Sequence, residues 1–236
     1  MKFGKKPAKR LRKCCPLSSY LNMSQVAFPP VMAWERPIDY GMLGNDSVGD
    51  CTIAGHYHLR MNWHAVANAG TPLVVTTQQA LDDYSAITGY NPADPSTDQG
   101  ANMPDVLAYY KDKYATLDIQ NVDQIKAAMY LFGGAFIGFN VPQSMADQLN
   151  NGYDPDWAYS ASDKPSGEGH CVTPLGYGRD GLAVCSWGKI YRTSWDFWLA
   201  WVDEAYALAS SEWIKALGVS PSGLDLNGLL ADLGKL

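Results

Sequence analysis

The chain lacks the long apolar segments that membrane proteins carry. Its longest mostly apolar run, Ala127 to Phe139, is too short to span a bilayer and is interrupted by Gly133-Gly134. The basic start is not followed by the apolar core of a secretory signal, because prolines, serines and asparagine interrupt that region. We therefore expect a cytoplasmic protein with no membrane span.

Cysteines are few, and their pattern excludes two common kinds of cross-link. The five cysteines are odd in number and unevenly spaced, and Cys14 and Cys15 are adjacent. No CxxC pair occurs, and no cysteine has a histidine partner at zinc-finger spacing. The sequence suggests neither a disulfide framework nor a structural zinc site, and it contains no internal repeat.

Charged residues are also scarce, at 18% of the chain, whereas apolar residues make up 47%. Disordered proteins show the opposite balance, so the composition predicts a globular protein. With 236 residues the chain is long enough for one large domain or for two lobes that share a cleft.

The positive charge is concentrated at the start of the chain. Seven of the eighteen basic residues lie within the first thirteen positions, which leaves eleven against twenty-four acids in the body. We expect residues 1–30 to form a basic, extended arm, because Pro29-Pro30 disfavours a helix, and folding to begin near Val31. A solvated, flexible terminus is the plain interpretation. Contact with nucleic acid, an anionic membrane or an acidic partner is the alternative, and no specific nucleic-acid binding is inferred.

Apolar spacing and capping residues predict helices in the first half and strands in the second. We expect helices over 50–69, 76–89, 104–113 and 122–131, then a strand at 135–139 and a hairpin from His170 to Trp187. An aromatic stripe predicts a further helix over 195–206, and two short helical stretches follow from Ser211 and Leu224. The fold class is therefore α+β.

One cysteine and one histidine stand in settings that suit catalysis. Cys51 opens the helix at 50–69, where the helix N-terminus favours a thiolate, and His170 opens the hairpin. If the two meet in the fold, the imidazole can take the thiol proton and Cys51 becomes a nucleophile. The alternatives are an inert buried cysteine and a hydrogen-bonded core histidine.

These settings resemble those of the papain-like cysteine peptidases. Gly44-Asn45-Asp46-Ser47-Val48-Gly49-Asp50-Cys51-Thr52 is similar to that family's Asn-Gln-Gly-x-Cys-Gly-Ser-Cys-Trp, with Trp34 upstream. The run from Gly169-His170-Cys171-Val172 to Gly176-Tyr177-Gly178 is similar to its His-Ala-Val-x-x-x-Gly-Tyr-Gly, and Ser186-Trp187-Gly188 matches the end of its Asn-Ser-Trp-Gly. Asp98-Gln99-Gly100-Ala101 resembles the family's glycine-rich loop beside the cleft.

The resemblance implies a papain-like fold, with a helical lobe at about 31–130, a β-rich lobe at about 131–236 and an active-site cleft between them. It implies a peptidase or amidase that acts on a peptide or protein substrate and needs no metal or organic cofactor. Cys51 would be the nucleophile and His170 the base. Asn45 and the Cys51 N–H would be the oxyanion donors, and Ser186 or Cys185 would stand in place of the family's Asn that orients the histidine.

Two alternatives to peptide hydrolysis stay open: a papain-like module that binds a peptide or protein partner with little or no catalysis, and a thiol-dependent acyl transferase.

No family-like propeptide precedes the domain, because only about fifty residues lie before Cys51. We interpret His56, His58 and His64 as interface or surface residues rather than metal ligands, and Asp46 and Asp50 as helix caps or catalytic groups with equal weight.

Overall fold

A single antiparallel sheet organises the protein. The computed structural model describes residues 1–9, 11, 14–210, 213–214 and 223–235. In this part of the chain the strand order is β2-β7-β3-β4-β5-β6, and β1 pairs with β4 beside that path. The strands are β1 (Met32–Ala33), β2 (Tyr114–Thr116), β3 (Phe136–Pro142), β4 (Pro165–Tyr177), β5 (Gly181–Ser186), β6 (Lys189–Ser194) and β7 (Val202–Leu208).

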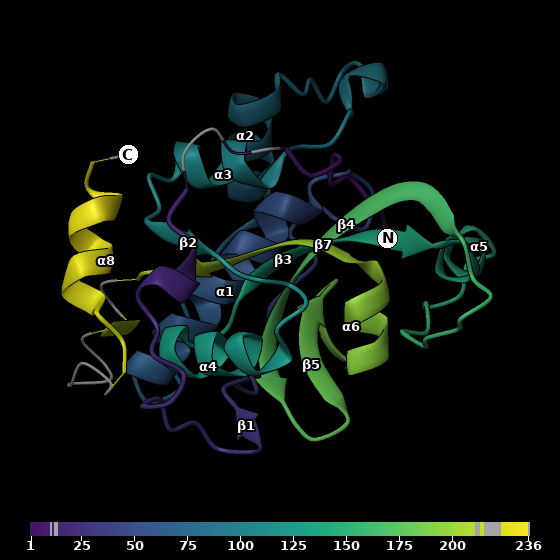
Figure 1. The fold of residues 1–236 in the computed structure, drawn as a ribbon. Coiled ribbons are helices and arrows are strands. Elements are labelled where there is room, and N and C mark those ends of the chain that lie inside the picture. Colours follow the sequence, from purple (N-terminus) through teal and green to yellow (C-terminus); the bar gives the residue numbers. More distant parts are fainter. Residues whose placement is uncertain (10, 12–13, 211–212, 215–222, 236) are drawn as a thin grey trace.

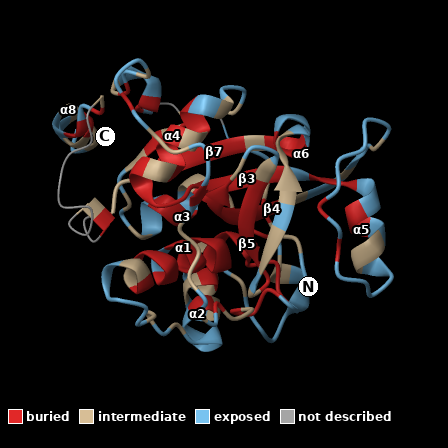
Figure 2. Ribbon diagram, turned by 90° about the horizontal axis from the view of Figure 1, so that it is seen from below, coloured by how far each residue is buried: buried red, intermediate tan, exposed pale blue. Residues whose placement is uncertain are grey.

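Helices surround this sheet, which confirms the α+β class (Figure 1). They are α1 (Cys51–Ala67), α2 (Thr77–Thr88), α3 (Met103–Tyr109), α4 (Val122–Phe132), α5 (Gln143–Asn150), α6 (Trp195–Trp201) and α8 (Leu226–Leu233), with 3-10 turns η1 (Leu17–Ser19) and η2 (Pro95–Thr97). Figures 1 and 2 place the two labelled ends of the chain on opposite sides of the molecule.

Helix α1 is the central helix, and nearly all of its length is buried (Figure 2). It packs on β4 closely enough that the Thr173 hydroxyl donates to the carbonyl of Gly55 at 2.7 Å. A Cβ on Gly55 would already lie 3.5 Å from the Cys171 carbonyl oxygen and sulfur, so a larger residue would push helix and strand apart. This contact fixes α1 one turn past Cys51 against the middle of β4.

The capping signals in the sequence are confirmed. The Thr76 hydroxyl accepts from the Gln79 N–H at the start of α2, and the Asn121 side chain accepts from the Gln124 N–H at the start of α4. Gly89 and Gly133 end these helices with positive φ angles of 78° and 71°.

Three expected elements have clearly different bounds. The helix expected over 104–113 ends at Tyr109. Strand β4 begins at Pro165 rather than His170, because the residues before His170 pair with β3. The helix expected over 195–206 is wrong beyond residue 201: Val202 and Tyr206 lie in β7, which pairs with β3 and β2. The helical stretch expected from Ser211 begins outside the described residues, whereas α8 agrees with the stretch expected from Leu224.

The described part of residues 1–30 does not form a solvated, flexible terminus. Cys15, Leu17, Leu21 and Val26 are buried in the apolar core, and Lys5 is only 4% exposed. A few apolar side chains along a polar stretch are enough to hold that stretch against a larger apolar core. Their spacing follows neither a helical nor a strand period, so the sequence did not predict this packing.

No helix among the described residues has the length and apolar character required to cross a membrane. The division into lobes at about residue 130 stays a prediction. Strand β2, which precedes that boundary, joins the sheet through β7.

Candidate functional site

Cys51 is the first residue of α1 and is 1% exposed. The loop that leads to it is held by Asp98, whose carboxylate accepts from the Gly49 N–H at 3.0 and 3.1 Å. The Tyr84 hydroxyl donates to the same carboxylate at 2.7 Å. The loop that contains Asp98 thus supports the turn before Cys51.

The two polar residues of that turn are both buried. The Asn45 amide donates to the Val48 carbonyl at 3.0 Å, within its own loop. Asp50 occupies the N-cap position, but its side chain makes no capping hydrogen bond, and both carboxylate oxygens are buried without a hydrogen-bond partner. Burial raises the pKa of Asp50 to about 8, so it carries a proton at neutral pH.

His170 lies on β4 and is fully buried. Its Nε2 forms a 2.8 Å hydrogen bond with the Ser186 hydroxyl, and its ring stacks on Trp187 with centroids 4.3 Å apart. The other ring nitrogen, Nδ1, is buried and makes no hydrogen bond. Among the candidates for orienting His170, the structure brings Ser186 to the ring.

Cys185 is not brought to His170. It is paired with Thr173 across the sheet and packs in the same apolar cluster as Cys51 and Cys171. Successive residues of a strand point to opposite faces, so Cys185 and Ser186 cannot both face the imidazole.

The Cys51 thiol lies against β4 at the backbone of Cys171, the residue that follows His170. Burial raises the pKa of the thiol to about 12, and backbone hydrogen bonds from Cys171 and Gly4 act in the opposite direction. Burial also lowers the pKa of His170 to about 3, with a smaller contribution from His58. At neutral pH the pair is therefore a neutral thiol and a neutral imidazole.

The cover over Cys51 comes from the start of the chain, whose backbone is hydrogen-bonded on both sides. The N–H groups of Gly4 and Lys5 donate to the Gly169 carbonyl at 3.1 and 2.9 Å. On the other side, Ala101 N–H donates to the Gly4 carbonyl and Lys6 N–H to the Ala101 carbonyl, both at 2.9 Å. We call residues 1–6 the covering segment.

The covering segment fits tightly at Gly4. A Cβ on Gly4 would lie 1.9 Å from the Gly49 carbonyl oxygen, and one on Gly100 would lie 2.0 Å from the Gly4 carbonyl oxygen. Beside Gly4, the Phe3 ring contacts the edge of His170, with centroids 5.4 Å apart. The segment thus shields both candidate catalytic side chains from solvent.

This role of residues 1–6 was missed from the sequence. One signal was present: Gly4 is the only glycine among the first forty residues, set between Phe3 and a pair of lysines. A lone glycine in an extended stretch indicates close approach of another backbone, which is what the structure shows at Gly49.

His56 and His58 of α1 are core residues, so their interpretation as surface or interface residues is wrong. His56 Nε2 pairs with Asp112 at 2.6 Å, and its ring stacks on Tyr110. His58 Nε2 bonds the Gly41 carbonyl at 3.0 Å, and burial lowers the pKa of His58 to about 4. Within the described residues, no three His, Cys, Asp or Glu side chains are arranged as metal ligands.

A separate cavity of about 610 Å³ lies at the β4–β5 turn, between Trp157, Arg179 and Arg192. Neither Cys51 nor His170 lines it, so we do not assign it to the chemistry of these residues.

Comparison with known proteins supports the fold. No protein-family model matches the chain, and no curated protein matches it in sequence. Among solved structures it is similar to xylellain, a cysteine protease from Xylella fastidiosa, with 15% identity, a TM-score of 0.55 and coverage of 88% of this chain and 96% of that one. It is also similar to digestive procathepsin L 3 of the Tenebrio molitor larval midgut, with 12% identity, a TM-score of 0.58 and coverage of 88% and 76%. The chain therefore has the fold of the papain-like cysteine peptidases, as the sequence motifs predicted.

Proposed function

We propose that the protein is a cysteine peptidase or amidase that acts on peptide bonds through Cys51 and His170. The observation that carries the proposal is the covering segment itself. An extended polypeptide backbone crosses the Cys51 thiol and is hydrogen-bonded to Gly169 on one side and Ala101 on the other. A surface that holds one extended peptide beside a thiol and an imidazole is suited to holding a substrate peptide there.

In the proposed reaction, Nδ1 of His170 accepts the thiol proton and the Cys51 sulfur attacks the carbonyl carbon of the substrate. The Cys51 N–H and the second Nδ2 hydrogen of Asn45 donate to the oxygen as it becomes negative. The imidazolium then gives its proton to the leaving amine, and the C–N bond breaks. A water molecule, deprotonated by His170, hydrolyses the thioester that remains, and Ser186 holds the ring through Nε2.

The reaction requires the covering segment to leave. While the segment is seated, burial keeps the pKa of the Cys51 thiol at about 12, and a neutral thiol is a poor nucleophile. Solvent entry removes most of this burial, and the helix N-terminus then favours the thiolate.

The test uses the full chain with Gly4→Leu, which cannot seat against Gly49. We expect Cys51 to be alkylated by iodoacetamide at least about tenfold faster at pH 7 than in the unmodified chain, since the reactive species is the thiolate. Adding His170→Ala removes the base, and the pH at which alkylation reaches half its maximum rate should then rise towards about 8.5. Alkylation no faster than that of an ordinary thiol would overturn the proposal.

Peptide cleavage is measured in the same background with a mixed fluorogenic peptide library. Cys51→Ala should abolish turnover. Ser186→Ala should lower kcat, because His170 loses its hydrogen-bond partner, whereas Cys185→Ser, on the other face of β5, serves as the matched control. Equal effects of these two substitutions would contradict the role proposed for Ser186.

The second candidate is a module that binds a peptide or protein partner without catalysis. It is favoured by one observation: the Asn45 amide already donates to the Val48 carbonyl rather than towards solvent. Binding of library peptides without turnover in the Gly4→Leu chain would support it. An acyl transferase would instead give an amide product when a primary amine is added, and product analysis by mass spectrometry separates that case from hydrolysis.

A further inference from the structure

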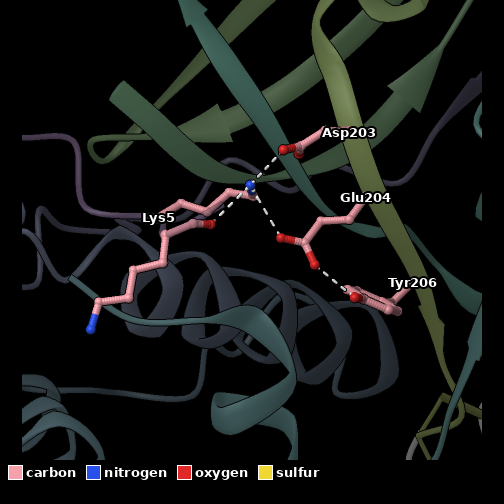
Figure 3. A network of polar contacts seen from close by, with 5 residues as sticks. Lys5, Asp203, Glu204 and Tyr206 are labelled. Atoms are coloured by element: carbon pink, nitrogen blue, oxygen red, sulfur yellow. Dashed lines mark hydrogen bonds and ion pairs between the residues drawn. The ribbon is translucent and has the colours of Figure 1, made fainter. Parts of the chain in front are cut away.

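The side chain of Lys5 is buried completely and ends between two carboxylates (Figure 3). Its ammonium donates to Asp203 Oδ2 at 2.9 Å and lies 3.1 Å from Glu204 Oε1. Its remaining contact is the Lys6 carbonyl of its own segment, at 3.2 Å. Both protein carboxylates come from β7, a strand of the central sheet, so they remain in place when the segment leaves.

The space around the Lys5 stem has the shape of a side-chain pocket. A Cβ on Gly138 of β3 would lie 1.9 Å from Lys5 Cε and 2.8 Å from the Met103 sulfur. Glycine at this position therefore leaves room for a row of methylene groups, with the acidic pair beyond them. A long side chain with a charged end fits such a pocket, whereas a short acidic one would leave it partly empty.

The acidic pair retains an acceptor, Asp203 Oδ1, that Lys5 does not satisfy. Glu204 is only 8% exposed, and its Oε1 is reached only by the ion pair with Lys5, whereas Asp203 Oδ1 is buried without a hydrogen-bond partner. The other Glu204 oxygen accepts from the Tyr206 hydroxyl at 2.7 Å, which fixes the direction of the carboxylate. Two carboxylates facing a single ammonium leave an acidic site for a cationic ligand.

The pocket lies one residue along the bound backbone from the thiol. Gly4 contacts Cys51 through its backbone, and the next residue, Lys5, places its side chain between Asp203 and Glu204. A substrate bound along the same backbone groups would thus place a side chain near its reacting bond into this pocket.

We propose that Asp203 and Glu204 form a subsite that selects a lysine or arginine side chain of the peptide substrate, and that Lys5 occupies it as a built-in ligand. This inference rests on the proposed function and adds the substrate class: peptides with a basic residue close to the bond that is cut. The competing explanation is an ion pair that only fastens the start of the chain, with no role in recognition.

The test measures binding to the full chain with Gly4→Leu, in which the pocket is free. One probe is the fluorescein-labelled peptide MKFGKKPAK, which repeats residues 1–9, and the other carries norleucine in place of the lysine at position 5. Norleucine keeps the stem and removes the charge. We expect the lysine peptide to bind at least about tenfold more tightly by fluorescence anisotropy, because its ammonium meets two buried carboxylates.

Adding Glu204→Gln should reduce that ratio to below about threefold, since the amide keeps the shape and loses the charge. Asp105→Asn is the matched control: it removes the exposed ion pair with Lys9, which lies outside both the covering segment and the pocket, and it should leave the ratio unchanged. A single thermal transition in each variant shows that it is folded. If Gly4→Leu does not fold, Lys5→Met provides a second chain with the ammonium removed.

Equal affinities for the two probes, or a ratio unaffected by Glu204→Gln, would overturn the inference. A turnover measurement separates it from the proposed function. Lysine-selective binding without cleavage keeps the pocket and refutes the peptidase, whereas cleavage with no preference for lysine or arginine keeps the peptidase and refutes the pocket.

Discussion

At the scale of single residues, burial decides the protonation of the candidate site. Asp50 and Cys51 are neighbours whose pKa values both rise, because neither charged form is solvated. For Asp50 the folded pKa is about 8, against an ordinary value of 3.8. Between these two values the unfolded chain has lost a proton that the folded chain keeps, so the free energy of unfolding falls as the pH rises.

Asp50→Asn should remove this contribution. We expect the free energy of unfolding of the unmodified chain to fall, relative to the variant, by about 1–3 kcal/mol from pH 5 to pH 7. Urea unfolding at the two pH values measures the difference. Asp46→Asn, at an exposed position of the same loop, is the control, and an identical pH slope in the Asp50→Asn chain would contradict the prediction.

Several residues of the candidate site could be predicted because their signals are local. The setting of His170, the one-residue slip that brings Ser186 to its ring, and Cys51 at a helix start all follow from short runs of sequence. The burial of His58 and Asp50 could not be predicted, because their partners and cover come from distant parts of the chain. Exposure is a property of the packed fold, not of a residue's neighbours in sequence.

At the scale of elements, helix ends could be predicted and one helix–strand boundary could not. The Asn121 cap and Gly133 stop are side-chain and backbone effects within one turn. In contrast, β7 is buried on both faces and lacks the alternation that marks a strand. Its aromatic and apolar residues continue the spacing of α6, and only pairing with β3 and β2 makes the segment extended.

The cap of α4 gives a prediction at this scale. Asn121→Ala leaves the Gln124 N–H without its 3.0 Å acceptor, and we expect the free energy of unfolding to fall by about 1 kcal/mol. Chemical denaturation measures this change. Gln120→Ala, at the exposed preceding position, should change stability by less than about 0.5 kcal/mol, and equal losses would show that the cap is not responsible.

At the scale of the whole molecule, the start of the chain contacts segments that lie far from it, and far from one another, in the sequence. The covering segment is hydrogen-bonded to Ala101 and Gly169 and is ion-paired with β7. This arrangement could not be predicted, because each contact is non-local and the lysine-rich composition is also that of a solvated terminus.

Hydrogen exchange should report whether the segment is seated. In the unmodified chain we expect the N–H groups of Lys6 and Ala101 to be protected from exchange. The Lys6 N–H donates to the Ala101 carbonyl, and the Ala101 N–H donates to the Gly4 carbonyl. Gly4→Leu should raise their exchange rates at least about tenfold while the amides of α4 keep theirs. Gly178→Leu, where a Cβ meets open space, is the matched control, and unchanged exchange in Gly4→Leu would contradict the seating described for residues 1–6.

The covering segment is covalently joined to the chain whose site it occupies. A tethered ligand is present at an effective concentration on the order of millimolar, independent of how dilute the protein is. Dilution would therefore not free the site, although it would release a separate inhibitor. A peptide supplied at micromolar concentration must bind far more tightly than the tethered lysine segment, or meet a chain in which that segment has been cut or displaced.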